Sequence, residues 1–243
     1  MCMGTMLLLK ELGFELHVAT LTQGDGGSFE YSPQEIARIR RSEAEESCRR
    51  LGATYHYGGC YDFGIFADDK TNRRVTALFR EVDPWLVLTH PPVDYLSDHE
   101  NTSRLVRNAC FYGPVRNYDT GSFSTKERTN RIPYLYYAQP IEGIDLFGNP
   151  VAPHCYVDIS QQVEKKAELL GCHESQRNWL RAHHGMDEYL ESMKRWAGKL
   201  GQDASPLFGR EVAYAEAFCQ HRGHAYPADN VLAQLLPEKV RKA

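Results

Sequence analysis

Residues 85–111, WLVLTHPPVDYLSDHENTSRLVRNACF, decide how this chain is expected to fold. The apolar run at 85–88 is typical of a short buried strand. Residues 100–111 carry apolar side chains at helical spacing, so we expect a helix there. The segment between them therefore follows the carboxyl end of a strand, which is where ligands bind in open α/β sheets.

Two histidines and two aspartates lie in this strand-to-helix crossing: His90, Asp94, Asp98 and His99. Imidazole and carboxylate are ligands that Zn²⁺ and similar metals accept, so the pattern predicts a metal site centred on Asp98 and His99. A plain structural interpretation stands beside it, because Pro91-Pro92 and Ser97-Asp98 are ordinary turn and helix-capping residues. Short clusters with irregular spacing are weak motifs, so the residues alone leave both interpretations open.

The composition bounds the class of protein. The chain has 243 residues, of which 42% are hydrophobic and 25% charged, which is ordinary for one soluble globular domain. Its net charge of −4 gives no electrostatic case for binding nucleic acid or an anionic membrane. No apolar run approaches the roughly 20 residues of a membrane span. Seven scattered cysteines without a Cys-x-x-Cys pair indicate no disulfide framework, so we expect a cytoplasmic setting.

Helical and strand patterns alternate along the chain. Strands are expected at 14–21, 54–57, 85–89, 134–138, 156–159 and 210–218, and helices at 6–12, 33–51 and 72–82. A helix capped by Ser160 is expected to continue to about Trp179, followed by a helix from Asp187 to Leu200, a loop at 202–209 and a helix from Pro227. This alternation predicts a three-layer α/β fold with a mainly parallel sheet, in one domain covering 1–243.

Two polar segments are harder to interpret. Residues 22–28 contain three glycines, but lack the spacing of a Walker or a dinucleotide-binding loop. They form either a plain loop or a backbone that approaches a ligand closely. Residues 113–131 are rich in glycine, serine and threonine, which is typical of a loop bordering the site or a mobile lid.

The N-terminal pattern is unusual for such a fold. The chain opens on the helix at 6–12 and crosses to the strand at 14–21. A parallel βαβ unit needs a strand before that helix. We therefore expect the numbering to start in the middle of a unit, and an unpaired sheet to make the chain poorly soluble unless it forms a homo-oligomer.

Several segments together resemble the LmbE/PIG-L family of zinc-dependent N-deacetylases. They follow the family's order and span nearly the whole chain. The matching residues are Thr22-x-Gly24-Asp25-Gly26-Gly27, Arg40-Arg41-x-Glu43-Ala44, Leu51-Gly52, Asp62, His90-x-x-x-Asp94-x-x-x-Asp98-His99, Asp158-Ile159, Lys165-Lys166, His173-x-Ser175-Gln176 and Tyr214-Ala215-Glu216-Ala217-Phe218.

The resemblance implies a Rossmann-like fold and hydrolysis of an N-acetyl group from an N-acetylglucosamine-type sugar conjugate, with Zn²⁺ as the cofactor that activates water. It implies that His99 is a zinc ligand and that Asp98 is the catalytic carboxylate beside it, orienting a neighbouring group. It implies that Arg40 and Asp62 line the sugar pocket. We assign His90 and Asp94 to the same substrate-binding set.

The chain departs from the family pattern in two places. The family's His-Pro-Asp-Asp-x-Glu motif, which supplies two zinc ligands and the general base, is absent before Gly4, and we expect it to lie upstream of Met1 together with the missing strand. Many relatives carry a histidine three residues before the zinc histidine, to stabilise an oxyanion or protonate the leaving amine. This chain has Leu96 there, so His173 or Tyr95 is a candidate replacement.

Three functions compete on these residues. The first is the zinc-dependent N-deacetylase, an enzyme acting on a small sugar conjugate, with no nucleic acid and no membrane span. The second is a non-catalytic sugar-binding or interaction member that has lost its metal site. The third is a hydrolase acting on a different amide, which Leu96 favours.

Overall fold

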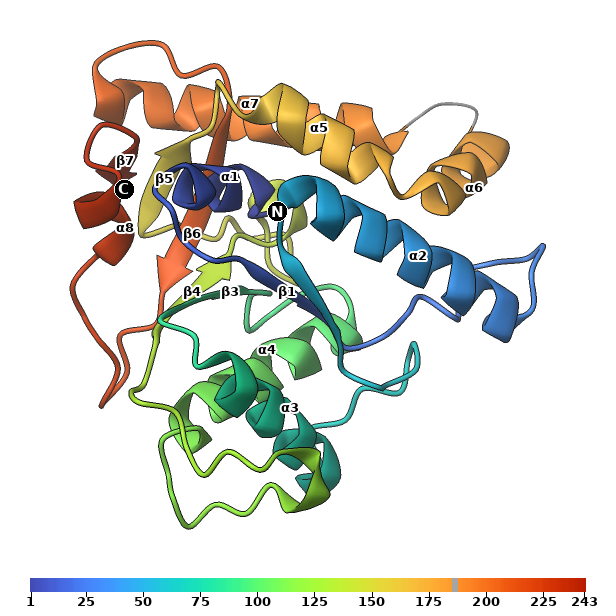
Figure 1. Cartoon of the computed structure of the whole chain (residues 1–243). Helices are drawn as coiled ribbons and strands as arrows, with labels where there is room; N and C mark the ends of the chain where they lie inside the picture. The colour runs from blue at the N-terminus through green and yellow to red at the C-terminus, as the bar shows by residue number, and fades with distance from the viewer. Residues whose placement is uncertain (185–187) are drawn as a thin grey trace. The chain divides into compact units, whose positions relative to one another are not determined.

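The computed structural model describes residues 1–184 and 188–243, in which helices and strands alternate (Figure 1). The strands are β1 His17–Thr20, β2 Thr54–Tyr57, β3 Leu86–Thr89, β4 Tyr134–Ala138, β5 Cys155–Asp158, β6 Ala215–Gln220 and β7 Val240–Lys242. The α-helices are α1 Met3–Glu11, α2 Pro33–Leu51, α3 Asp69–Val82, α4 Ser97–Tyr112, α5 Val163–Gly171, α6 Glu174–His184, α7 Glu188–Phe208 and α8 Val231–Leu235. Two 3-10 helices cover Gly121–Phe123 and Ile141–Gly143.

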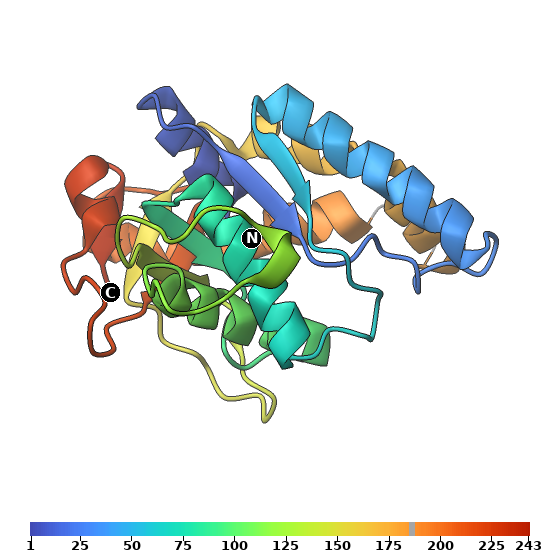
Figure 2. The same cartoon turned by 60° about the horizontal axis from the view of Figure 1, so that its bottom comes forward.

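The strands form one parallel pair and one mixed sheet. β1 pairs with β2 in parallel, as the two neighbouring blue arrows in Figure 2 show. The larger sheet has the order β3-β4-β6-β5-β7, with β3 parallel to β4 and β4 antiparallel to β6. The α/β class that we predicted is therefore confirmed. Parallel pairing holds for two strand pairs, but the antiparallel β4–β6 pair makes the larger sheet mixed rather than mainly parallel.

The chain forms two compact units and crosses between them four times. Unit 1 contains residues 1–62, 156–216 and 239–243. Unit 2 contains residues 63–155 and 217–238. Within the described ranges, no helix is long and apolar enough to cross a membrane, and all seven cysteines are free thiols.

Unit 1 has a buried carboxylate at the amino end of α1. Glu216 accepts hydrogen bonds from the backbone N–H groups of Gly4 and Thr5 (2.8 Å each), from Thr5 Oγ1 (2.7 Å) and from Lys166 Nζ (2.8 Å). Burial works to raise the pKa of Glu216, but Lys166 and Thr5 work against it and the pKa is lowered overall. A charged carboxylate at this position satisfies helix N–H groups that α1 leaves unpaired.

α2 begins and ends where the sequence predicts. Ser32 and Glu35 form a capping box, Pro33 occupies the first helical position, and Gly52 follows with a φ of 69°. Ser47 Oγ on this helix donates to the Leu169 carbonyl on α5 (3.0 Å). The buried apolar face of α2 therefore has a fixed partner within unit 1.

In unit 2, Arg80 on α3 holds the segment that follows α4. Its buried guanidinium donates to the carbonyls of Gly113 (3.3 Å), Val115 (2.9 Å) and Tyr118 (2.7 Å). Thr129 N donates to the Gly113 carbonyl (3.0 Å), which closes the segment on itself. Residues 113–131 are thus anchored on α3, which favours a fixed loop over the mobile lid.

Several helix boundaries differ from the sequence expectations. The helix expected from Ser160 is two helices, α5 and α6. Ser160 does not cap α5, because its Oγ donates to Asp158 Oδ1 (2.6 Å) and accepts from Tyr214 N (3.2 Å). α7 continues through the loop expected at 202–209, with Pro206 in its last turn. The expected helix start at Asp187 lies outside the described residues. Beyond α8 the chain ends in a strand, β7.

A histidine pair joins the parallel strands of unit 1. His17 Nδ1 lies 2.9 Å from His56 Nε2, and Glu15 Oε1 lies 3.2 Å from His17 Nε2. Because a carboxylate only accepts, His17 carries its proton on Nε2 and His56 donates from Nε2. Burial, and then the neighbouring His17, lower the pKa of His56 below 6.5.

This pair predicts acid sensitivity. A histidine whose pKa is lowered in the fold binds fewer protons than in the unfolded chain, so its contribution to stability is present above about pH 6.5 and is lost as the pH falls below that value. His56→Gln keeps an N–H donor without a titrating ring, so the decrease in Tm between pH 7 and pH 5 is expected to become shallower. Parallel Tm–pH profiles of the two proteins would contradict this prediction.

Candidate metal centre

The candidate site lies in unit 2, where β3 ends and α4 begins. α4 starts at Ser97, three residues earlier than the sequence pattern predicts, and carries Asp98 and Glu100 in its first turn. Acidic side chains are stabilising at this position because they lie at the positive end of the helix dipole. Asp98 and His99 therefore lie on a helix rather than in a loop.

His90, Asp94 and His99 converge at this point. His99 Nδ1 lies 2.9 Å from Asp94 Oδ1, and the ring of His90 stacks on that of His99 with centroids 4.3 Å apart and an interplanar angle of 12°. The side chain of Asp94 is 1% exposed. One ligand atom from each of the three residues lies within 4.8 Å of the others.

Two buried polar atoms of this cluster lack a hydrogen-bond partner. Among the residues that the structure describes, these are Asp94 Oδ2 and His90 Nδ1. An unsatisfied buried carboxylate oxygen is costly, and native structures rarely tolerate one without a water or an ion. Imidazole and carboxylate are ligand types that Zn²⁺ accepts, so the chemistry of the donors fits the metal. Because Asp94 Oδ1 lies at Nδ1 of His99, the nitrogen of His99 left for a metal is Nε2.

Burial keeps His90 neutral. Burial first and then His99 lower the pKa of His90 to about 4, although Asp94 works in the opposite direction. At neutral pH the ring therefore carries no positive charge, and neutral imidazole is the form that ligates metals.

The structure distinguishes the two aspartates of the cluster. Asp94, five residues before His99, is the carboxylate that contacts the histidine ring. Asp98 is also buried, and its Oδ2 accepts a hydrogen bond from the backbone N–H of Phe63 (2.7 Å). The sequence pattern gave Asp98 the orienting role, because it is the neighbour of His99 in the chain.

Arg40 and Asp62, the predicted sugar-pocket residues, lie in unit 1 and hold its glycine-rich loop. Arg40 donates to the carbonyls of Gly24 (2.9 Å) and Gly27 (2.7 Å), and to Gln176 Oε1 (2.6 Å). Asp62 accepts from Gly26 N (2.9 Å). A Cβ at Gly24, whose φ is 72°, would lie 2.6 Å from Arg40 Cδ, so this glycine allows the arginine to lie against the loop.

His173, a predicted candidate for the role of the missing histidine, lies between α5 and α6 in unit 1. Burial lowers its pKa, with Glu43 acting in the opposite direction. Glu43 in turn accepts from Ser175 N (2.7 Å) and Ser175 Oγ (2.8 Å). No local pattern in the sequence predicts the contacts of Glu43 with Ser175 or of Arg40 with Gln176, because more than 130 residues separate the partners.

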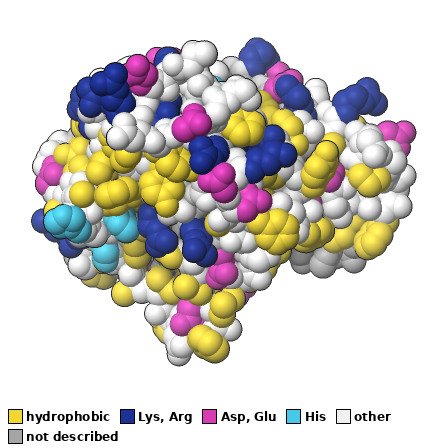
Figure 3. Space-filling model, turned by 90° about the horizontal axis from the view of Figure 1, so that it is seen from below, with side chains coloured by type: hydrophobic (Ala, Val, Ile, Leu, Met, Phe, Trp, Pro, Cys, Tyr) yellow, Lys and Arg dark blue, Asp and Glu magenta, His cyan; other side chains and the backbone are white. Residues whose placement is uncertain are grey.

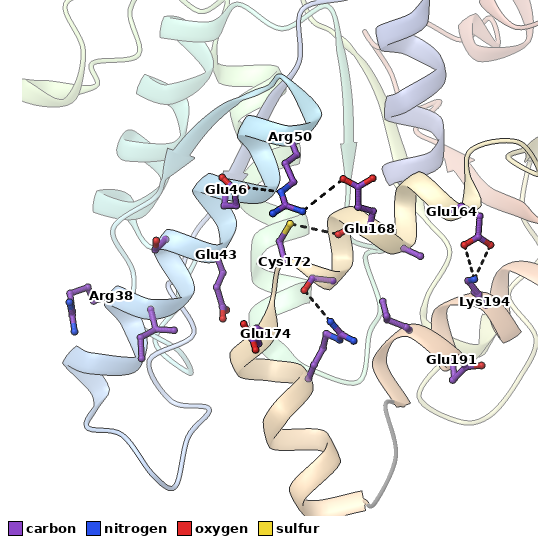
Figure 4. Close-up of a pocket in the computed structure, with 16 residues that line it drawn as sticks. Arg38, Glu43, Glu46, Arg50, Glu164, Glu168, Cys172, Glu174, Glu191 and Lys194 are labelled. Atoms are coloured by element: carbon purple, nitrogen blue, oxygen red, sulfur yellow. Dashed lines mark hydrogen bonds and ion pairs between the residues drawn. The ribbon is translucent and has the colours of Figure 1, made fainter.

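A cavity of about 1050 Å³ lies in unit 1 among α2, α5, α6 and α7 (Figure 4). Several of its charged side chains pair with each other: Arg50 reaches Glu46 and Glu168, and Lys194 reaches Glu164. None of the cluster residues lines it. We therefore place the candidate chemistry at the histidine cluster, which has unpaired ligand atoms, rather than at this larger hollow.

Residues 1–110, which include the whole cluster, match the family model described as PIG-L: GlcNAc-PI de-N-acetylase. This stretch is a PIG-L family domain. The resemblance inferred from the sequence motifs is thereby confirmed.

The chain is also similar to a curated enzyme along most of its length. It is 26% identical, over 225 residues, to a 4-oxalmesaconate hydratase from Pseudomonas putida; the match covers 88% of this chain and 80% of the relative.

Two solved structures share the fold. One is GalB, the 4-carboxy-2-hydroxymuconate hydratase from Pseudomonas putida KT2440 (TM-score 0.74, 23% identity, 93% of this chain and 92% of that chain). The other is the N,N′-diacetylchitobiose deacetylase from Pyrococcus horikoshii (TM-score 0.71, 22% identity, 92% of this chain and 80% of that chain). The PIG-L fold of this chain is thus shared by a hydratase and a deacetylase.

Proposed function

We propose that this PIG-L protein is a zinc-dependent N-deacetylase, a hydrolase that removes the N-acetyl group from an N-acetylglucosamine-type sugar conjugate. The observation that carries the proposal is the cluster of His90, the buried Asp94 and the half-buried His99, with unpaired atoms on Asp94 and His90. In this proposal both units, residues 1–243, act as one cytoplasmic deacetylase domain.

His99 is the proposed zinc ligand. Asp94 Oδ1 accepts a hydrogen bond from the Nδ1–H of the ring, so Nε2 is unprotonated and would be available to a metal. When bound, Zn²⁺ supplies a Lewis acid that polarises the amide carbonyl and lowers the pKa of water. His90 lies flat against His99 and adds no positive charge beside the metal, because its own pKa is about 4.

The other predicted residues have roles in their own units. Asp98, the predicted catalytic carboxylate, holds the backbone of Phe63 against the first turn of α4. Arg40 and Asp62 are proposed to bind the sugar through the glycine-rich loop that they hold. Carboxylates and backbone carbonyls suit a substrate with many hydroxyl donors.

Hydration of an unsaturated acid is the second candidate. It is favoured by the hydratase relative, which aligns with 88% of this chain, and by Leu96, which cannot protonate a leaving amine. An acid of this class carries several negative charges. Residues 84–103, the segment that carries the cluster, contain no lysine or arginine to neutralise them, and Arg104 follows directly. The low positive charge of this segment favours the neutral sugar.

One experiment separates the candidates. The purified protein is incubated with Zn²⁺ and either N,N′-diacetylchitobiose or 4-oxalmesaconate, while released acetate and the loss of conjugated absorbance are followed. Acetate release with the sugar supports the deacetylase, and loss of absorbance with the acid supports the hydratase. Sugar binding without either reaction and without bound zinc supports the non-catalytic alternative.

The roles of the two aspartates can be tested by the same conservative change at each. Asp94→Asn keeps the shape of the side chain but removes the charge behind His99, so zinc affinity is expected to fall by roughly 10- to 100-fold. Asp98→Asn is expected to leave zinc affinity nearly unchanged. Affinity is measured by competition with a chromophoric chelator. A larger loss at Asp98 than at Asp94 would reverse the two roles.

A further inference from the structure

Phe63 in unit 2 has an unusual backbone conformation for its residue type. Its φ is 60°, in the left-handed region where a side chain with a Cβ is strained. The aromatic side chain is also 68% exposed, so core packing does not compensate for the strain. Strain of this kind persists only where the surroundings impose it, and it clusters at ligand sites.

The surroundings that impose it belong to the first turns of α4. The Phe63 N–H donates to Asp98 Oδ2 (2.7 Å), and Asn101 Nδ2 donates to the Ile65 carbonyl (2.8 Å). These two bonds tie residues 63–65 to the helix turn that carries His99. The backbone at Phe63 is therefore fixed beside this helix turn, and its exposed ring projects from a tethered segment rather than from a loose loop.

A second exposed aromatic ring is tied to the same turn. Tyr95 packs edge-on against His99, with ring centroids 5.4 Å apart and an interplanar angle of 86°. The side chain remains 66% exposed. Phe63 and Tyr95 are thus held by successive residues of α4, Asp98 and His99.

Exposure alone would not mark these two rings. Hydrophobic side chains lie among charged ones across the face drawn in Figure 3, as on most protein surfaces. What distinguishes Phe63 and Tyr95 is exposure combined with a tether to the first turn of α4. The backbone N–H of Phe63 donates to Asp98, and the ring of Tyr95 packs on His99.

The charges around the two rings indicate what kind of ligand they bind. Asp94, Asp98 and Glu100 lie in the same segment, and residues 84–103 contain no lysine or arginine. This charge disfavours an anionic ligand. A pyranose ring is neutral, its C–H face packs against aromatic rings, and its hydroxyls donate to carboxylates.

We propose that Phe63 and Tyr95 form an aromatic subsite that binds a neutral pyranose ring of the substrate. Asp98 is the positioning residue of this subsite, because it holds Phe63 in its strained conformation. The choice of a sugar as ligand rests on the proposed function, whereas the subsite itself rests on the tethered backbone of Phe63 and the ring contact of Tyr95.

The test uses the full chain and three variants. Tyr95→Ala and Phe63→Gly are each expected to raise the Kd for N,N′-diacetylchitobiose roughly tenfold, measured by isothermal titration calorimetry. Phe63→Gly is also expected to keep or raise the Tm, because glycine adopts a positive φ without strain. The matched control is Phe147→Ala, which removes an unrelated ring of unit 2 that is 87% exposed and is expected to leave the Kd unchanged.

Binding and turnover are measured separately so that the two proposals can fail independently. Weaker binding by both variants, with or without acetate release by the wild type, supports the subsite. Acetate release with unchanged Kd and KM in both variants overturns the subsite and leaves the deacetylase standing. Failure of the wild type to bind the disaccharide overturns the subsite as well, and a lower Tm for Phe63→Gly would show that the ring serves packing.

Discussion

His99→Ala is expected to lower zinc affinity by at least about 100-fold and to abolish turnover. Loss of a carboxylate behind a ligand histidine already costs roughly 10- to 100-fold, and this change removes the ligand itself. It also leaves Asp94 buried, with neither of its oxygens facing a ring nitrogen. Zinc content by mass spectrometry after dialysis, and acetate release, measure the two effects.

Two further histidines provide the comparison. His224 is exposed in unit 2 and is not one of the three residues whose ligand atoms converge, so His224→Ala is expected to retain zinc and activity. His90→Ala removes the stacked ring but leaves the His99–Asp94 contact, so an intermediate loss is expected. Full zinc occupancy in His99→Ala would contradict the assignment of this cluster as the metal centre.

Local patterns in the sequence predicted the individual elements well. The strand expected at 134–138 coincides with β4, and the strand at 54–57 coincides with β2. The start and end of α2 follow from Ser32, Pro33 and Gly52, because capping depends on side chains within a few residues of each other. The residues that determine such a helix boundary all lie within a few positions of it in the sequence.

The arrangement of the strands was less predictable because it depends on distant partners. β4 pairs in parallel with β3 but antiparallel with β6, and nothing in the sequence of residues 134–138 states that difference. Ser160 shows the same limit at a helix start. From the sequence its hydroxyl is expected to cap a helix. In the structure it is hydrogen-bonded instead to Asp158 and to the backbone of Tyr214, 54 residues away.

The candidate site has one feature that local sequence signals predict and one that depends on the folded chain. Its location was predicted from the crowding of imidazoles and carboxylates after a strand, and the structure brings three of the four residues together. The partner of His99 was not predictable from neighbouring positions. Because α4 begins at Ser97, the chain turns between Asp94 and His99, and the carboxylate five residues back meets the ring.

The buried ion pair of unit 1 gives the largest expected effect on stability. Glu216 and Lys166 are both almost fully buried, with Oε1 and Nζ 2.8 Å apart. Lys166→Met is expected to lower the free energy of unfolding by about 3–5 kcal/mol, because it leaves a buried carboxylate without its cation. For a chain of this length that corresponds to a decrease in Tm of roughly 10 °C. Lys165→Met is the matched control, since Lys165 pairs with Glu168 at the surface, and such pairs contribute about 0–1 kcal/mol.

A double variant separates the charge from the shape of the pair. Glu216→Gln replaces the carboxylate with a neutral amide, whose carbonyl still accepts one of the bonds from the amino end of α1. Lys166→Met/Glu216→Gln therefore removes both charges of the pair. Its loss of stability is expected to be smaller than the sum of the two single losses. Strictly additive losses in urea-induced unfolding would mean that Lys166 and Glu216 stabilise unit 1 independently, and that Glu216 acts through its bonds to Gly4 and Thr5 alone.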